Sequence, residues 1–176
     1  MENKLFLLIL DLEVFLYYES TDKLKTYLKV KGKYYNFHPK LCEFLILVKI
    51  KFEIVICADK EKKYVTSLAK QMLKKISLQW SDVLFCFGRE EWKSDSMGQL
   101  TKPLDVIWRK NNNKHDACNT IRFCKNVPCE PNENFIIVAP IGSKGNWLME
   151  FWEKISVVGM EGKDVVNVID ILTYVR

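Results

Sequence analysis

The segment that most restricts the fold of this chain is residues 4–11, KLFLLILD. The residues from Leu5 to Leu10 are all large and apolar. A strand with one face in solvent alternates apolar and polar residues, so an unbroken short run is typical of a strand buried on both faces of a parallel sheet. Parallel strands need long crossover connections, usually helices. The run therefore predicts an α/β fold.

The rest of the chain alternates strand-like and helix-like segments. Residues 24–37 alternate apolar and polar side chains around Lys31-Gly32, which predicts a β-hairpin. Further strands are predicted at 51–58, 82–88, 133–140 and 153–158, and helices at 38–50, about 60–75, 103–109 and 163–175. Strands that alternate with helices favour a layered α/β sandwich with a mainly parallel central sheet.

Length and composition indicate one ordinary globular domain over 1–176. A chain of 176 residues suits a single core. No apolar run reaches the roughly 20 residues of a membrane span, and no signal peptide opens the sequence, so we expect an intracellular protein, cytoplasmic or nuclear, without a membrane partner. Its six cysteines are expected to be reduced. The net charge of +5 is spread along the chain and supports only weak attraction to polyanions.

Two acids end the first strand. Asp11 and Glu13 are two residues apart, and ligands of parallel α/β sheets bind at the carboxyl ends of the strands. Ala58 and Ala139 end two later predicted strands, so they are expected to line the same crevice as Asp11. Taken alone, without matching segments elsewhere in the chain, the two acids favour a strand that simply emerges into solvent.

The order of several segments resembles one enzyme family. DLEVFL (11–16) resembles the motif D-x-D-x-[TV]-L, FEIVICA (52–58) resembles the family's second strand, and TKPLDVIWRK (101–110) resembles its lysine segment. NENFIIVAP (132–140) resembles the strand with the family's aspartate pair. The chain is thus similar to haloacid dehalogenase superfamily phosphatases of the FCP/SCP-like group, which act on the RNA polymerase C-terminal domain. The resemblance implies a HAD-like three-layer sandwich with a β-hairpin flap at about 24–37.

The resemblance also implies a set of catalytic roles. In that family an aspartate attacks phosphorus, and the acid two residues later acts as general acid and base. A hydroxyl and a lysine contact the phosphoryl oxygens, and magnesium is held by the first aspartate and the acid pair. Asp11 keeps the nucleophile position, Lys102 matches the lysine, and Glu13 replaces the acid/base aspartate. Ala58, Ala139 and Pro140 replace the hydroxyl and the aspartate pair.

These departures predict a catalytically inactive, phosphatase-like domain, or pseudophosphatase. A displaced acid costs on the order of a hundredfold in rate, and neither Ala139 nor Pro140 can ligate a metal through its side chain. We therefore expect no cofactor and a role as a protein-binding or assembly module. One alternative is a residual magnesium-dependent phosphatase of phosphoproteins, with Asp11 as nucleophile and metal ligand, Glu13 as acid/base and Lys102 on phosphate. Another is a basic component of a ribonucleoprotein assembly.

Three smaller features have alternative interpretations. Lys102 also suits a surface lysine before a helix. A Cys-containing insertion is predicted at about 111–131, where His115, Cys118, Cys124 and Cys129 suggest zinc, but their spacing favours incidental thiols. Aromatic residues of the hairpin either hold a peptide or pack on the domain, and those near residue 150 favour core packing over a partner surface: Tyr34, Tyr35 and Phe37, and Trp147, Phe151 and Trp152.

Overall fold

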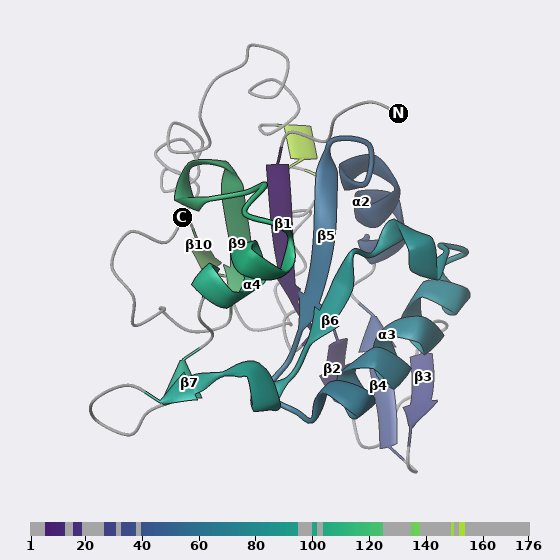
Figure 1. Ribbon diagram of the computed structural model, residues 1–176. Helices are drawn as coiled ribbons and strands as arrows, with labels where there is room; N and C mark the ends of the chain where they lie inside the picture. Colours follow the sequence, from purple (N-terminus) through teal and green to yellow (C-terminus); the bar gives the residue numbers. More distant parts are fainter. Residues whose placement is uncertain are drawn as a thin grey trace.

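A computed structural model describes most of the first three quarters of the chain (Figure 1). The described residues are 6–12, 16–18, 27–30, 33–37, 40–94, 100–101, 104–124, 135–137, 149 and 152–153. The helix predicted at 163–175 lies outside them. Of the strand predicted at 153–158, only Glu153 is described, and its backbone is helical.

Five parallel strands form the central sheet. They are β1 (Phe6–Asp11), β5 (Phe52–Cys57), β6 (Phe85–Phe87), β9 (Thr120–Cys124) and β10 (Phe135–Ile137), in the order β10-β9-β1-β5-β6. Every neighbouring pair is parallel. The predicted α/β class with a mainly parallel sheet is therefore confirmed. β6 is shorter than the predicted 82–88 because a 3₁₀ turn, η1 (Trp80–Asp82), precedes it.

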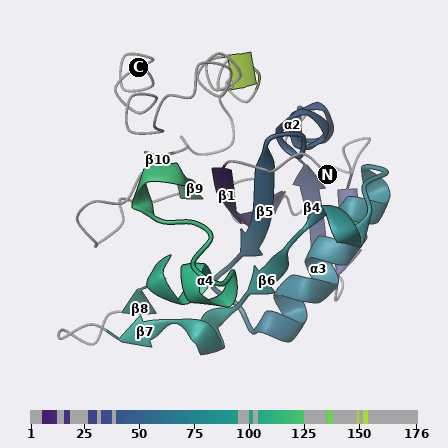
Figure 2. The ribbon, with the colours of Figure 1, turned by 45° about the horizontal axis from the view of Figure 1, so that its top comes forward.

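Helices cover both faces of this sheet (Figures 1 and 2). α2 (Leu41–Val48) and α3 (Lys62–Lys75) bury their apolar sides against one face, and α4 (Leu104–Lys110) packs on the other. β1 supplies both cores: Leu8 and Leu10 belong to the α2–α3 core, whereas Leu7 and Ile9 belong to the α4 core. Two covered faces explain why the strand is apolar at every position.

Smaller antiparallel elements extend from the ends of the sheet. β2 (Leu16–Tyr18), β3 (Tyr27–Val30) and β4 (Lys33–Phe37) form a three-stranded sheet in the order β2-β4-β3, which contains the predicted hairpin. β7 (Lys93–Ser94) pairs with β8 (Leu100–Thr101). Two further 3₁₀ turns are η2 (Arg89–Glu91) and η3 (Ala117–Asn119). None of the helices in the described part of the chain has the length and apolar character needed to cross a bilayer.

Part of the segment predicted as an insertion, residues 111–131, belongs to the central sheet. Thr120–Cys124 form β9, which lies between β1 and the edge strand β10. The segment escaped detection because Arg122 interrupts its apolar pattern, yet this arginine is only 7% exposed. Ile121 and Phe123, on either side of it, are fully buried in the α2–α3 core. Trp152 is partly buried and packs against the same core, as predicted for the aromatic residues near 150. Trp147 and Phe151 lie outside the described residues.

Gly88 follows β6 and lies against the backbone of Lys62, the first residue of α3. A Cβ atom at this position would lie 2.3 Å from the backbone nitrogen of Lys62 and 2.4 Å from its Cα. Backbone atoms cannot move aside as a flexible side chain does, so Gly88→Ala is expected to lower the free energy of unfolding by about 2 kcal/mol. Urea denaturation measures the loss. Ser67→Ala, on the exposed side of α3, is the control and should change it by less than about 0.5 kcal/mol. An unchanged midpoint for Gly88→Ala would contradict the close approach.

Candidate functional site in a phosphatase-like crevice

The carboxyl ends of the central strands meet in one row. Asp11, the last residue of β1, is in register with Cys57, the last residue of β5, and Cys57 is in register with Phe87 at the end of β6. Asp11 is only 4% exposed. A carboxylate at the buried tip of a strand is costly unless polar groups surround it. The predicted position of Asp11 at this edge is therefore confirmed, and its burial distinguishes it from a strand end that emerges into solvent.

Asp11 and Ala58 belong to opposite faces of the sheet edge. Alternation along β1 places Asp11 on the face of Leu7 and Ile9, where α4 packs. Cys57 lies in that same core, whereas Ala58 is 3% exposed and lies in the α2–α3 core. Sequence reasoning paired Asp11 with Ala58, but the strand register puts the Cys57 position directly beside it.

A small apolar pocket opens beside Ala58. Its volume is about 90 Å³. Leu12, Tyr35, Ala58, Lys60, Tyr64, Val65 and Leu68 line it. The flap contributes Tyr35, whose hydroxyl lies 3.0 Å from the hydroxyl of Tyr64 on α3. Of the hairpin aromatics, Phe37 is 5% exposed in the core, and Tyr35 packs against the same core while it borders the pocket. Packing on the domain therefore applies to both residues.

Most of the other predicted site residues cannot be placed. Glu13, Lys102, Ala139 and Pro140 lie outside the described residues. α4 begins at Leu104, two positions after Lys102, and packs on the Asp11 face of the sheet.

The predicted strand that ends at Ala139 and Pro140 is not the neighbour of β1. The neighbour on that side is β9. β10 is one strand further out, at the sheet edge, and neighbouring strands are about 4.8 Å apart. The chain continues from β9 with Lys125 and Asn126. These two residues, a cation and a neutral amide, follow the strand that lies beside β1.

The residues weighed as possible zinc ligands form no metal site in the part of the chain that is described. There, no three His, Cys, Asp or Glu side chains are close enough together to hold an ion. His115 is buried and contacts Glu53, Cys118 is exposed on η3, and Cys129 lies outside the described residues. Burial raises the pKa of the Cys86 thiol in β6 to about 11, so this cysteine stays protonated at neutral pH.

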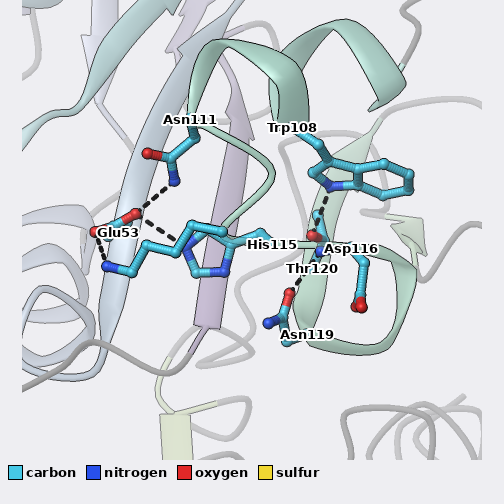
Figure 3. A network of polar contacts seen from close by, with 8 residues as sticks. Glu53, Trp108, Asn111, His115, Asp116, Asn119 and Thr120 are labelled. Atoms are coloured by element: carbon cyan, nitrogen blue, oxygen red, sulfur yellow. Dashed lines mark hydrogen bonds and ion pairs between the residues drawn. The ribbon is translucent and has the colours of Figure 1, made fainter.

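A polar network around Glu53 lies near the opposite end of the sheet (Figure 3). Three side chains from the segment after α4 contact its carboxylate. Asn111 Nδ2 donates to Glu53 Oε2 at 2.7 Å, Lys114 Nζ donates to Oε1 at 2.5 Å, and His115 Nε2 lies 2.9 Å from Oε2. Burial alone would raise the pKa of Glu53, but these hydrogen bonds and the Lys114 charge lower it to about 2.

A second contact fixes the same segment from the other side of β1. The Trp108 indole Nε1 donates to Thr120 Oγ1 at 2.9 Å (Figure 3). Leu7 is in register with both Glu53 and Thr120, so the two polar residues lie on the strands that flank it. Together they hold the end of α4 and the following segment on the sheet. Sequence reasoning missed this network because its members are up to 62 positions apart.

Comparison with known proteins decides the family. The family described as NLI interacting factor-like phosphatase matches residues 6–127, well over half of the chain. This chain belongs to that family. No curated protein sequence matches it. The family match begins with β1 and ends three residues after β9, so it includes Asp11, Ala58 and Lys102 but stops before Ala139 and Pro140.

Two solved structures share the fold of this NLI interacting factor-like phosphatase domain. One is fission yeast Fcp1, an RNA polymerase II CTD phosphatase, bound to beryllium fluoride, with 16% identity and a TM-score of 0.52. The other is described as Fcp1, an essential RNA polymerase II CTD phosphatase, with 17% identity and a TM-score of 0.52. The matches cover 91% and 90% of this chain but only 52% and 50% of the Fcp1 chains. The chain thus spans about half the length of these proteins.

Proposed function

We propose that this domain is a catalytically inactive member of the phosphatase family that binds a segment of an intracellular partner protein at the carboxyl edge of its sheet. The observation that carries the proposal is the apolar pocket lined by Ala58, Leu12 and Tyr64. Ala58 lies on the α2–α3 face of the sheet rather than on the face of Asp11, and its methyl group donates no hydrogen bond. The surface therefore suits an apolar side chain.

The residues that follow β9 support loss of catalysis. A magnesium ion in this fold would be held by Asp11 together with carboxylates that follow the neighbouring strand. Lys125 has no lone pair when protonated, and Asn126 offers one neutral oxygen. This donor set does not fit a magnesium ion that must offset the charge of both a carboxylate and a phosphate, so we derive no phosphoryl-transfer step.

The pocket has the size and polarity for one side chain of a bound segment. Full burial of a medium-sized apolar side chain contributes about 1.5–3 kcal/mol. Tyr35 and Tyr64, whose hydroxyls are paired, line this pocket. Each hydroxyl can donate a hydrogen bond to a main-chain carbonyl of that segment or accept one from a main-chain N–H. Apolar burial with a few directed polar groups is the usual composition of a peptide-binding cleft.

The catalytic part of the proposal is tested with p-nitrophenyl phosphate and magnesium. Hydrolysis by the wild-type protein is expected to equal that of Asp11→Asn, which preserves the shape of the side chain but cannot act as a nucleophile. Magnesium with beryllofluoride should not raise the melting temperature of the wild-type protein. Magnesium-dependent turnover that is lost in Asp11→Asn would establish a residual phosphatase and overturn this part.

The binding part is tested by panning a library of displayed random peptides. The wild-type protein is expected to enrich sequences that share one apolar position, and Ala58→Leu, which fills the pocket, should reduce their affinity about tenfold or more. Tyr64→Ala removes part of the pocket wall and should also lower the affinity for these peptides. Thermal melting shows whether both variants fold. Failure to enrich any peptide, or equal affinity for all three proteins, contradicts the proposal.

A further inference from the structure

The exposed large hydrophobic side chains of the described residues gather at one corner of the domain. Ile46 is 43% exposed, Ile50 54%, Trp80 37% and Leu84 41%. No other large hydrophobic residue in the described part of the chain is exposed to this degree. Single exposed hydrophobics need no explanation, but several together mark an interaction surface.

An ion pair brings these residues together. Lys49 Nζ at the end of α2 lies 3.4 Å from the Asp82 carboxylate in η1. Ile50 adjoins Lys49, and Ile46 lies one helical turn before Ile50. Trp80 and Leu84 each lie two residues from Asp82. We call this surface, formed by Ile46, Ile50, Trp80 and Leu84, the α2–η1 corner.

The α2–η1 corner is away from the crevice. Leu84 precedes β6 and its backbone nitrogen donates to the carbonyl oxygen of Ile54, in the first half of β5. Ile50 precedes β5. The corner therefore lies toward the amino ends of the strands, whereas Asp11 and Ala58 lie at the carboxyl ends. Its occupant need not compete with a segment bound beside Ala58.

The charge beside the corner is positive. Lys70 Nζ lies 5.0 Å from the centre of the Trp80 ring, and Lys74 and Lys75 are exposed in the last turn of α3. α3 contains no acidic residue. The nearby acid, Asp82, is paired with Lys49, and Glu43 on the outer side of α2 is paired with Lys40. The lysines of α3 are therefore not balanced by carboxylates of this corner.

We propose that the α2–η1 corner binds an acidic amphipathic segment of a partner protein. Apolar side chains of that segment would cover Ile46, Ile50, Trp80 and Leu84, and its carboxylates would face Lys70, Lys74 and Lys75. A nucleic acid fits the corner less well: three of its four apolar residues are aliphatic and offer no ring for bases to stack on. This inference does not depend on the function proposed for the crevice.

The first test compares two fluorescein-labelled helical peptides by anisotropy. One has leucines on one helical face and glutamates on the other, and its partner has glutamine in place of every glutamate. The glutamate peptide is expected to bind about tenfold more tightly, and its affinity should fall as salt is added, because exposed charges are screened over about 8 Å at physiological ionic strength.

Substitutions locate the binding surface. Trp80→Ala is expected to lower the affinity for the glutamate peptide by about 30-fold, as for an aromatic anchor that becomes buried on binding. Lys74→Glu combined with Lys75→Glu should weaken it by about tenfold. Lys63→Glu is the control for each single reversal, since it changes the charge at one exposed position of α3 about 16 Å from Lys74, and it should change affinity less than about twofold.

Three results would overturn the inference. Equal affinity for the glutamate and glutamine peptides would exclude charge recognition, and an undiminished affinity in Trp80→Ala would place the peptide elsewhere. Tighter binding of an oligouridine than of the glutamate peptide would identify a nucleic-acid surface instead. Circular dichroism of each variant shows that a loss of binding is not a loss of fold.

Discussion

Phe44→Ala is expected to lower the free energy of unfolding by about 3–5 kcal/mol, the largest effect predicted for this protein. Phe44 is fully buried on the inner side of α2. Its ring meets that of Phe123 in β9 edge to face, with 5.9 Å between the ring centres and an angle of 81° between the planes. Removing the ring leaves a cavity between the helix and the middle of the sheet and also loses the aromatic contact.

Urea denaturation followed by circular dichroism measures this loss. Ile46→Ala is the matched control, because it shortens an apolar side chain two positions away on the same helix that is 43% exposed. It should change stability by less than about 0.5 kcal/mol. Equal effects of the two substitutions would show that α2 does not pack on β9 through Phe44.

Glu53→Ala is expected to lower the free energy of unfolding by about 3 kcal/mol at neutral pH. The substitution leaves buried donors without their acceptor, and breaking a buried charged pair from one side is strongly destabilising. The side chain of His115 is only 1% exposed, so water cannot easily replace the lost carboxylate. Lys114, by contrast, is 41% exposed and can be solvated, which keeps the expected cost at the lower end of the range.

The same network predicts how stability depends on pH. The pKa of Glu53 is about 2 in the folded protein and near 4.5 when the chain is unfolded. Its contribution is therefore complete above pH 4.5 and disappears as the pH falls toward 2. The full difference in pKa corresponds to roughly 3 kcal/mol, which partial contact with solvent reduces to about 2 kcal/mol. Urea titrations at several pH values between 2 and 7 measure this loss.

Two variants separate this contribution from the general effect of acid. Glu53→Ala should lack the part of the acid-induced loss that belongs to Glu53, so its stability curve approaches that of the wild type as the pH falls. Glu43→Ala removes an exposed carboxylate paired with Lys40 and should change stability by less than about 0.5 kcal/mol at neutral pH. Parallel curves for the wild type and Glu53→Ala would contradict the assigned pKa.

Local patterns were sufficient for β1, β5 and the helices α2, α3 and α4. The apolar run at 4–11 and the one at 51–58 became β1 and β5, and helical spacing placed α2, α3 and α4 within a few residues. Each of these elements buries a continuous stripe or both faces, so its periodicity reports its environment directly. Asp11 at the end of β1 followed from the same reasoning.

Those patterns did not predict which distant segments pair in the sheet. β9 has Arg122 at its centre. In the sequence this arginine suggests a solvated loop residue, but in the structure it is buried. The sequence placed Ala139, at the end of the strand predicted at 133–140, in the same crevice as Asp11. The parallel order β10-β9-β1 puts β9 between these two strands.

By itself the sequence determined the α/β class and the strand that ends at Asp11, because an unbroken apolar run records burial on both faces within one segment. Only the tertiary structure decided which residues face one another. It put Cys57 rather than Ala58 beside Asp11, lined a pocket with Ala58, joined Glu53 to His115 across 62 positions and gathered Ile46, Ile50, Trp80 and Leu84 at one corner. Strand register and helix packing set these neighbours, and neither is encoded in any single segment.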